Sequence, residues 1–368
     1  MTTILAAFVI AFALSLGITP LVKKLGIRFG AMDQPNERKV HLQPLPRIGG
    51  AAILLAFLIT VFISNFFNTN ISNQLSLTRE HLSLLAGGLI CFGVGLADDF
   101  HHLSPRIKFL FQILGASVAF WGGLRITYLF YDFSLASGFI FPLVISYSVT
   151  VFWFLLFINA VNLIDGLDGL AVGISLFTCL VLVIFLCLKD QYLIAMFYIA
   201  LAGASLGFLR YNFNPATIFL GDGGAYFLGY TIAGLSILGS VKTSLGAAIL
   251  IPLLAMGVPV FDTIISPVRR FIRGQDLFKP DKGHIHHRLV KFGFATKRAV
   301  LLIYGVSIIL CMFAVITFVR ITVALETQKT NLLVEWDIKA VARVYGCGAY
   351  ASWNLPRLMA QRHGLARA

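Results

Sequence analysis

Apolar runs of about 20 residues, separated by short polar segments, fill most of this 368-residue chain. Hydrophobic residues make up 58% of it and charged residues 12%, about half the charged share of a soluble domain. In lipid, only helices and closed barrels satisfy their backbone hydrogen bonds, so runs of this length predict an all-α polytopic membrane protein. About ten transmembrane helices are expected, at residues 3–22, 48–66, 82–97, 107–123, 138–158, 169–188, 191–209, 224–240, 246–268 and 299–320.

The distribution of positive charge predicts the orientation of these spans. The loops after every odd-numbered span carry eighteen Lys and Arg residues, against four in the opposite loops. By the positive-inside rule the N-terminus lies outside and the basic loops lie in the cytosol. Those loops either serve topology alone or also attract phosphates. Nucleic acid is not expected as a partner, because the basic residues stand at membrane exits with no binding fold around them.

One integral membrane domain is expected over residues 1–320, with no soluble module. Residues 321–368 form a polar, mixed tail to which no function is assigned, and a weak further span near 338–352 would bring its basic residues to the cytosol. The five cysteines form no CxxC pair, so we expect packing residues and not a disulfide framework or a zinc site.

Five aspartates stand at span ends, and the alternation of the spans brings all of them to one side of the membrane: Asp98, Asp99, Asp165, Asp168 and Asp222. Carboxylates beside lipid are costly and therefore indicate a function. A divalent metal ion bound to a diphosphate would account for them, because Mg²⁺ prefers oxygen ligands.

The adjacent pair Asp98 and Asp99 closes the third span in GLADDF. Neighbouring residues on a helix point about 100° apart, so one could face a metal or substrate while the other takes a proton. The alternative is a solvated helix end.

The segment NAVNLIDGLDGL has two polar pairs at a spacing of three residues, Asn159 with Asn162 and Asp165 with Asp168. A helical turn would place each pair on one face. Four such side chains between two apolar spans indicate a functional site and not loop filler.

Asp222 lies between glycines in FLGDGG at the start of the eighth span. An acid there is either an ordinary helix cap or part of a site for phosphate or metal-bound phosphate. Asn212 and Phe219, just upstream, could hold and stack a base, although a Phe in so apolar a chain is more often a packing residue.

Two basic loops could neutralise phosphates. GHIHHRL carries His284, His286, His287 and Arg288, which we expect to cover a diphosphate and sugar, since no cysteine accompanies them to form a zinc site. The alternative is a basic surface loop.

The loop after the first span carries Lys39, His41 and Arg47, and is interpreted as a second phosphate clamp.

Within the ninth span, Asp262 lies between two prolines, Pro259 and Pro267, where the helix is expected to bend or break. A buried acid there has a functional or a structural role, and could pair with a basic loop residue.

Together these stretches resemble the polyprenyl-phosphate N-acetylhexosamine-1-phosphate transferases of glycosyltransferase family 4, which include undecaprenyl-phosphate GlcNAc-1-phosphate transferases. The resemblance runs from Asp33 to Leu289 through PNERKVH, PRIGG, ADD, NAVNLIDGLDGLA, YN…FLGD and GHIHHRL. HIHH with PNERKVH is more similar to the GlcNAc branch than to the peptidoglycan branch. One departure is GDGGAYFLG, where Gly223 and Ala225 lack a hydroxyl that many relatives carry.

The resemblance implies transfer of a sugar 1-phosphate, GlcNAc-1-phosphate or a related one, from a UDP-sugar to undecaprenyl phosphate. UMP leaves, and the product begins a cell-envelope polysaccharide such as the O-antigen of lipopolysaccharide. It also implies Mg²⁺ or Mn²⁺ as cofactor, a multi-pass protein of the bacterial inner membrane whose active site faces the cytosol, and a homodimer.

The residues expected to carry this chemistry fall into three groups. The catalytic residues are Asp98, Asp99, Asp165 and Asp168; the metal ligands are Asp222, Asp98 and Asp165; and the substrate-binding residues are Lys39, His41, Arg47, Asn159, Asn162, Asn212, Phe219, His284, His286, His287 and Arg288.

Direct in-line attack of the lipid phosphate on the β-phosphorus is expected, and not a covalent aspartyl-phosphate intermediate, because phosphoryl transfer needs alignment and charge neutralisation most. A proton-coupled transporter is the alternative, but its acids should lie near mid-span and its halves should repeat. A CDP-alcohol phosphotransferase would carry a DGxxAR…GxxxDxxxD pattern, which this chain lacks.

Overall fold

The computed structural model describes residues 2–34, 44–64, 78–127, 131–132, 137–138, 140–240, 251–272, 284–317 and 319–320. Contacts divide the chain into two units, Met1–Val315 and Ile316–Ala368. The second unit, which includes the predicted tail and the weak span near 338–352, lies almost wholly outside the described residues, so the fold below is that of the first unit.

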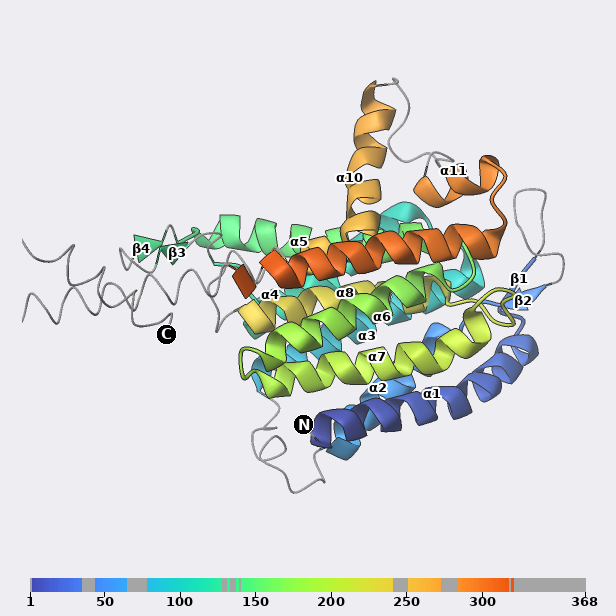
Figure 1. The fold of residues 1–368 in the computed structure, drawn as a ribbon, viewed down its shortest axis with the longest axis horizontal. Helices are drawn as coiled ribbons and strands as arrows, with labels where there is room; N and C mark the ends of the chain where they lie inside the picture. The colour runs from blue at the N-terminus through green and yellow to red at the C-terminus, as the bar shows by residue number, and fades with distance from the viewer. Residues whose placement is uncertain are drawn as a thin grey trace, which may run out of the picture. The chain divides into compact units, whose positions relative to one another are not determined.

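The first unit is mostly helical (Figure 1). Its labelled helices are α1 (Thr2–Arg28), α2 (Gly50–Ser64), α3 (Arg79–His101), α4 (Pro105–Gly122), α5 (Leu143–Ile164), α6 (Leu170–Cys187), α7 (Tyr192–Asn212), α8 (Gly221–Ser240), α10 (Gly257–Ile272) and α11 (Ile285–Lys291). A further helix covers Thr296–Thr317. Two short antiparallel pairs complete it: β1 (Met32–Asp33) with β2 (Leu45–Pro46), and β3 (Tyr131–Asp132) with β4 (Ser137–Gly138).

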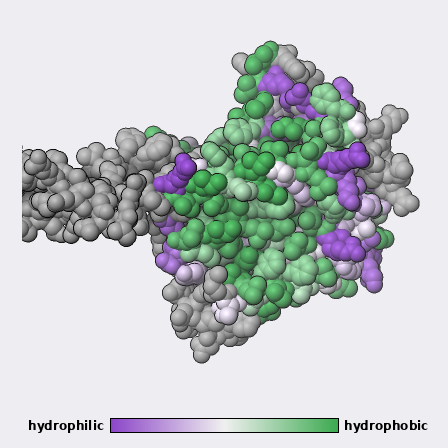
Figure 2. All heavy atoms as spheres, viewed as in Figure 1, coloured by the Kyte–Doolittle hydropathy of each residue, from purple (hydrophilic) through white to green (hydrophobic). Residues whose placement is uncertain are grey.

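Among the described residues, six helices are long and apolar enough to cross a membrane: α1, α3, α5, α6, α7 and Thr296–Thr317. The apolar helix α2 is shorter. One face of the molecule carries a broad apolar band, with hydrophilic side chains gathered toward its two ends (Figure 2). The prediction of an all-α, multi-pass membrane protein is confirmed, whereas the number of ten spans stays a prediction.

The long helices run side by side (Figure 1), with α1 along α7 and α3 between α4 and α8. Helix α8 also packs on α2 and α5, and most of its side chains are buried. The C-terminal ends of α3 and α5 and the N-terminal end of α8 therefore meet at the end of the bundle that carries β1 and β2. The backbone there is joined by hydrogen bonds from Gly49 to Phe219 and from Phe219 to Pro46.

The span expected at 246–268 differs from the prediction. Residues 241–250 lie outside the described part, residues 251–255 are helical, and α10 starts after a turn at Met256. Pro267 lies inside α10. The interruption therefore precedes both prolines, and Pro259 sits in the first turn of α10, where its missing N–H has no helical partner to lose.

Small residues let α8 approach its neighbours closely. A Cβ placed on Gly95 of α3 would lie 2.5 Å from the Cα of Gly223, and one on Gly50 of α2 would collide with Gly224. The glycines beside the two acidic motifs thus set the distance between these helices, as small residues do at helix interfaces in membranes.

We predict that Gly95→Ala destabilises the fold by about 1–3 kcal/mol, because the new methyl group must push α3 away from α8. Gly93 is the matched control on the same helix, since it is exposed and a Cβ there would meet nothing within 4 Å. Gly93→Ala should leave stability unchanged or raise it by up to about 1 kcal/mol. Apparent melting temperatures in detergent measure both effects, and equal shifts for the two variants would contradict the packing described here.

Candidate active site

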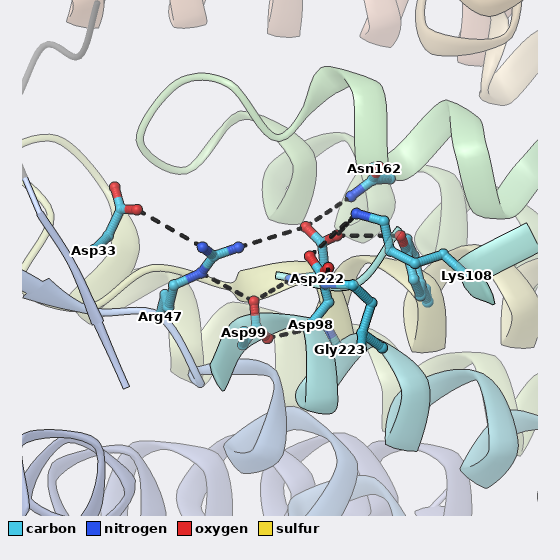
Figure 3. A network of polar contacts seen from close by, with 10 residues as sticks. Asp33, Arg47, Asp98, Asp99, Lys108, Asn162, Asp222 and Gly223 are labelled. Atoms are coloured by element: carbon cyan, nitrogen blue, oxygen red, sulfur yellow. Dashed lines mark hydrogen bonds and ion pairs between the residues drawn. The ribbon is translucent and has the colours of Figure 1, made fainter. Parts of the chain in front are cut away.

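Lys108 joins two of the predicted aspartates. Its Nζ, at the start of α4, donates to Oδ2 of Asp98 and to Oδ2 of Asp222, each at 3.1 Å (Figure 3). Asp98 lies near the end of α3 and Asp222 in the first turn of α8, 124 residues apart in the sequence by their numbers. Two carboxylates from different helices therefore share one cation, which offsets their mutual repulsion in a partly buried place.

The carboxylates of Asp98 and Asp222 also accept hydrogen bonds from other groups. Oδ1 of Asp222 accepts from Nδ2 of Asn162 at 3.1 Å, and its Oδ2 also accepts from the Tyr226 hydroxyl at 3.1 Å. Oδ1 of Asp98 accepts from the backbone N–H of Leu103 at 2.7 Å. These contacts fix both carboxylates toward the same point (Figure 3).

Asp99 turns to the N-terminus of α8. Its Oδ1 accepts from the N–H of Asp222 at 3.0 Å and its Oδ2 from the N–H of Gly223 at 3.2 Å. A carboxylate at this place satisfies two of the N–H groups that a helix start leaves without partners, and it complements the positive end of the helix dipole. Gly221, just before, has φ +76°, and a Cβ there would collide with Arg47.

Arg47 completes this corner from the segment between β2 and α2. Its Nε donates to Oδ1 of Asp99 at 3.0 Å, while its terminal nitrogens lie 3.8 Å from Asp33 and 3.9 Å from Asp222. Burial would lower the pKa of Arg47, but the charges of Asp99, Asp222 and Asp33 outweigh it and raise that pKa. The guanidinium predicted to clamp a phosphate is thus joined to the aspartates. We call Asp98, Asp99 and Asp222, together with Arg47 and Lys108, the acidic cluster.

Asp165 and Asp168 do not share a helical face. Helix α5 ends at Ile164, and residues 165–169 form turns, with Gly169 at φ +79°. The predicted helical turn is therefore wrong, because the glycines of IDGLDG end the helix there. Asp168 accepts from Nδ2 of Asn214 and from the N–H of Ala216, at 2.9 and 3.0 Å, and so holds the segment that leads into α8.

Asp165 instead lies near the cluster. Burial raises the pKa of its carboxyl to about 8, and the negative charges of Asp222 and Asp99 add to this effect. The two aspartates of this motif thus have different surroundings: Asp165 lies near the acidic cluster, and Asp168 contacts the loop between α7 and α8.

The two asparagines of the motif both lie in α5, three residues apart as predicted, but they contact different partners. Asn162 contacts Asp222, whereas Nδ2 of Asn159 donates to Oε1 of Gln112 at 3.0 Å and to the carbonyl of Leu155 at 2.8 Å. Asn159 thereby joins α5 to α4 one turn away from Asn162, and its contacts in this structure hold the two helices together.

Asn212 and Phe219 flank the entry to α8. Asn212 is buried, and its Nδ2 donates to the carbonyl of Ile218 at 3.0 Å. Phe219 is half-buried and its backbone pairs with Pro46 and Gly49. Both residues shape the loop in this structure, and their predicted contact with a base stays a prediction.

His284 pairs with the buried Asp262. Its Nδ1 lies 2.9 Å from Oδ2 of Asp262, and both residues are 5% exposed. The expectation that Asp262 pairs with a basic loop residue is met. Because His284 immediately precedes α11, this contact ties α11 to α10. Arg288 is exposed. Lys39, His41 and the side chains of His286 and His287 lie outside what the structure describes.

Lys108, Tyr226 and Gln112 contact predicted site residues but were not themselves predicted. Lys108 carried a signal, since a lone lysine just inside an apolar span is costly and points to a partner. Tyr226 and Gln112 carried none, because an aromatic or amide residue in such a span is common.

The cluster is suited to a hard divalent cation. Asp98 and Asp222 already share the ammonium of Lys108, and carboxylate oxygens are ligands that Mg²⁺ prefers. No set of three His, Cys, Asp or Glu residues stands together as a metal cage among the described residues. Two carboxylates with substrate phosphates and water are nevertheless a common way to hold Mg²⁺.

We predict that Asp99→Asn destabilises the protein by about 1–3 kcal/mol, because the amide places a donor where N–H groups and a guanidinium need an acceptor. Hydrogen exchange should speed up at the amides of Asp222 and Gly223 in particular. Asp33→Asn is the comparison, since Asp33 meets the same guanidinium only at 3.8 Å, and it should cost less than about 1 kcal/mol. Unchanged exchange at the start of α8 would contradict the capping role.

Known proteins similar to this chain are transferases. The sequence model of glycosyl transferase family 4 matches residues 81–240. A protein of Bacillus subtilis (strain 168), named probable undecaprenyl-phosphate N-acetylglucosaminyl 1-phosphate transferase, is 38% identical over 316 residues, which cover 86% of this chain and 85% of that protein. The decaprenyl-phosphate N-acetylglucosaminephosphotransferase of Mycolicibacterium smegmatis (strain ATCC 700084 / mc(2)155) is 37% identical over 78% of this chain and 75% of its own. The undecaprenyl-phosphate alpha-N-acetylglucosaminyl 1-phosphate transferase of Yersinia pestis is 27% identical over 95% and 92%.

Proposed function

We infer the reaction of this chain, which belongs to glycosyl transferase family 4, from its relatives and from the acidic cluster. It is an enzyme that transfers a sugar 1-phosphate onto a polyprenyl phosphate. The relatives give no support to the transporter alternative. The observation that carries the reaction to this structure is the pairing of Asp98 and Asp222 through one cation, at the end of a membrane bundle.

In finer terms, we propose UDP-GlcNAc as donor, undecaprenyl phosphate as acceptor and UMP as leaving group. The names of the relatives support the sugar and the lipid. The position of the cluster supports the acceptor, because a lipid phosphate lies at headgroup level and the carboxylates stand at helix ends. This step would begin the synthesis of a cell-envelope polysaccharide.

Asp98 and Asp222 would hold Mg²⁺ or Mn²⁺, with Asp165 near them. When bound, the ion would neutralise and align the diphosphate of the donor. The protein's own contribution is to fix the carboxylates: Asn162 and Tyr226 orient Asp222, and the N–H of Leu103 orients Asp98.

The cations of the cluster suit two polyanions that must meet. Arg47 and Lys108 stand on either side of Asp222, at 3.9 and 3.1 Å. We propose direct in-line attack of the lipid phosphate on the β-phosphorus, since the described site offers positioning and charge neutralisation. Exchange of labelled UMP into UDP-GlcNAc without any acceptor would indicate a covalent intermediate and contradict this course.

Charge at the two ends of the bundle supports a cytosolic active site in the inner membrane of a bacterium. The end with the cluster carries Arg28, Arg47, Lys108, Arg210, Arg288, Lys291, Lys297 and Arg298, whereas the other end carries Arg79, Arg125 and Lys189. By the positive-inside rule the first end faces the cytosol. Ten spans, a catalytic domain over residues 1–320 and a homodimer remain part of this proposal.

The decisive test is an assay of the purified chain with undecaprenyl phosphate, Mg²⁺ and a panel of radiolabelled UDP-sugars. We expect lipid-linked product from UDP-GlcNAc. Asp222→Ala should lower turnover by roughly 10²–10⁴-fold, because the shared cation loses one of its carboxylates. Asp190→Ala is the control, since Asp190 stands in the turn between α6 and α7 at the opposite end.

Sealed vesicles extend the same assay to orientation. Added UDP-sugar should be used by inside-out vesicles and not by right-side-out ones. No product from any sugar would contradict the proposed donor class, and product from right-side-out vesicles alone would contradict the orientation.

A further inference from the structure

Lys108 differs from every other charged group in the cluster in how it is held. Its side chain is 23% exposed, against 6% for Asp98 and 19% for Asp222, and within the part of the chain that the structure describes its ammonium contacts only those two carboxylates. A lysine is a point charge on a flexible four-carbon stem. Its ammonium can therefore leave the carboxylates without breaking any other part of the site.

Arg47 has no such freedom. Its side chain is 17% exposed and contacts Asp99, Asp33 and Asp222 through different nitrogens. Since Asp99 also holds the start of α8, moving Arg47 would disturb a structural corner. Of the two cations on Asp222, Lys108 is the one that can be replaced.

The point that Lys108 occupies is also where a divalent cation would be most favourable. Oδ2 of Asp98 and Oδ2 of Asp222 both face the ammonium at 3.1 Å. Arg47 also faces Asp99 and Asp33, so Lys108 is the cation that Asp98 and Asp222 share, and the aspartates here outnumber the two cations. A doubly charged ion in place of the ammonium would bring the pair closer to neutral. The ammonium and the ion cannot share this point, because like charges at that separation repel strongly.

We propose that Lys108 is a resident counter-cation which competes with a divalent metal ion for Asp98 and Asp222, and which contacts a substrate phosphate once the metal has replaced it. This inference rests on the proposed function for its second half only. In the substrate-free protein, Lys108 keeps two facing carboxylates neutralised and in place. In the loaded protein, the released ammonium adds positive charge beside the phosphates.

The proposal gives removal of Lys108 two opposite effects. Without the competing ammonium, the metal should bind the substrate-free protein more tightly, by about tenfold. Without the cation for the phosphate, turnover should fall by at least about tenfold. Loss of structure would weaken both properties, so tighter metal binding with slower turnover is a signature that damage to the fold does not produce.

The experiment titrates Mn²⁺ alone against the full chain in lipid nanodiscs and follows free Mn²⁺ by electron paramagnetic resonance. Lys108→Gln and Lys108→Met should both bind Mn²⁺ about tenfold more tightly than the wild type. Arg106→Gln removes the same charge from an exposed residue in the same turn of α4, and should change neither Mn²⁺ affinity nor turnover. Lys108→Arg, which keeps the charge, should not bind more tightly than wild type.

Two further measurements test whether the effect of Lys108 on Mn²⁺ affinity acts through Asp222 and whether it persists in a variant that is unstable without metal. In Lys108→Gln combined with Asp222→Asn, the gain in affinity should vanish, because one of the two carboxylates is gone. If a variant is stable only with metal, its melting temperature is followed as Mn²⁺ is withdrawn, and Mn²⁺ should stabilise it more than it stabilises the wild type.

Equal or weaker Mn²⁺ binding in both Lys108 variants, or equal stabilisation by Mn²⁺, would overturn the inference. Tighter binding with unchanged turnover would overturn its second half. A wild-type chain that binds Mn²⁺ as described but makes no lipid-linked product would overturn the proposed function and leave the competition between Lys108 and the metal standing.

Discussion

The carboxylate of Asp99 is the constraint on which the site depends. It accepts hydrogen bonds from the amides of Asp222 and Gly223 in the first turn of α8 and from Arg47, and so anchors α8 to α3 and to the segment before α2. The close approach of Gly95 to Gly223 is what makes these contacts reachable. With α8 held in this position, Asp222 faces Asp98, and the two neighbouring aspartates of α3 differ in their contacts. Asp99 caps the start of α8, whereas Asp98 shares the ammonium of Lys108 with Asp222.

This arrangement explains why so many charges are tolerated at the end of an apolar bundle. Each buried carboxylate of the α3–α8 corner is matched by N–H groups or by a cation, which lowers the cost of removing it from water. The cation that Asp98 and Asp222 share is Lys108, which we propose a divalent metal ion replaces. In the function proposed above, fixed carboxylates and a replaceable charge would serve to bring a soluble and a lipid-borne phosphate together.

Much of the site followed from residue types at span ends, because charge beside lipid is rare and must be satisfied. The length of the apolar runs predicted the helical membrane fold, and the alternation of the spans placed the aspartates at one end of the bundle. The cost of buried charge anticipated a basic partner for Asp262. Prediction failed where the outcome depended on backbone detail: the glycines around Asp165 and Asp168 end α5, so the two side chains point to different elements. The sequence also could not show which of Asp98 and Asp99 contacts the start of α8, since this depends on how α3 packs on α8.

The central claim is that Asp98 and Asp222 act as one ligand pair for a single cation. A double-mutant cycle on Mn²⁺ affinity, with Asp98→Asn, Asp222→Asn and the combined variant, tests it most directly. If the two carboxylates share one ion, either single change removes most of the binding, and the combined variant binds little more weakly than each single variant. Losses that simply add would mean that the two carboxylates act at separate sites, and would contradict the account.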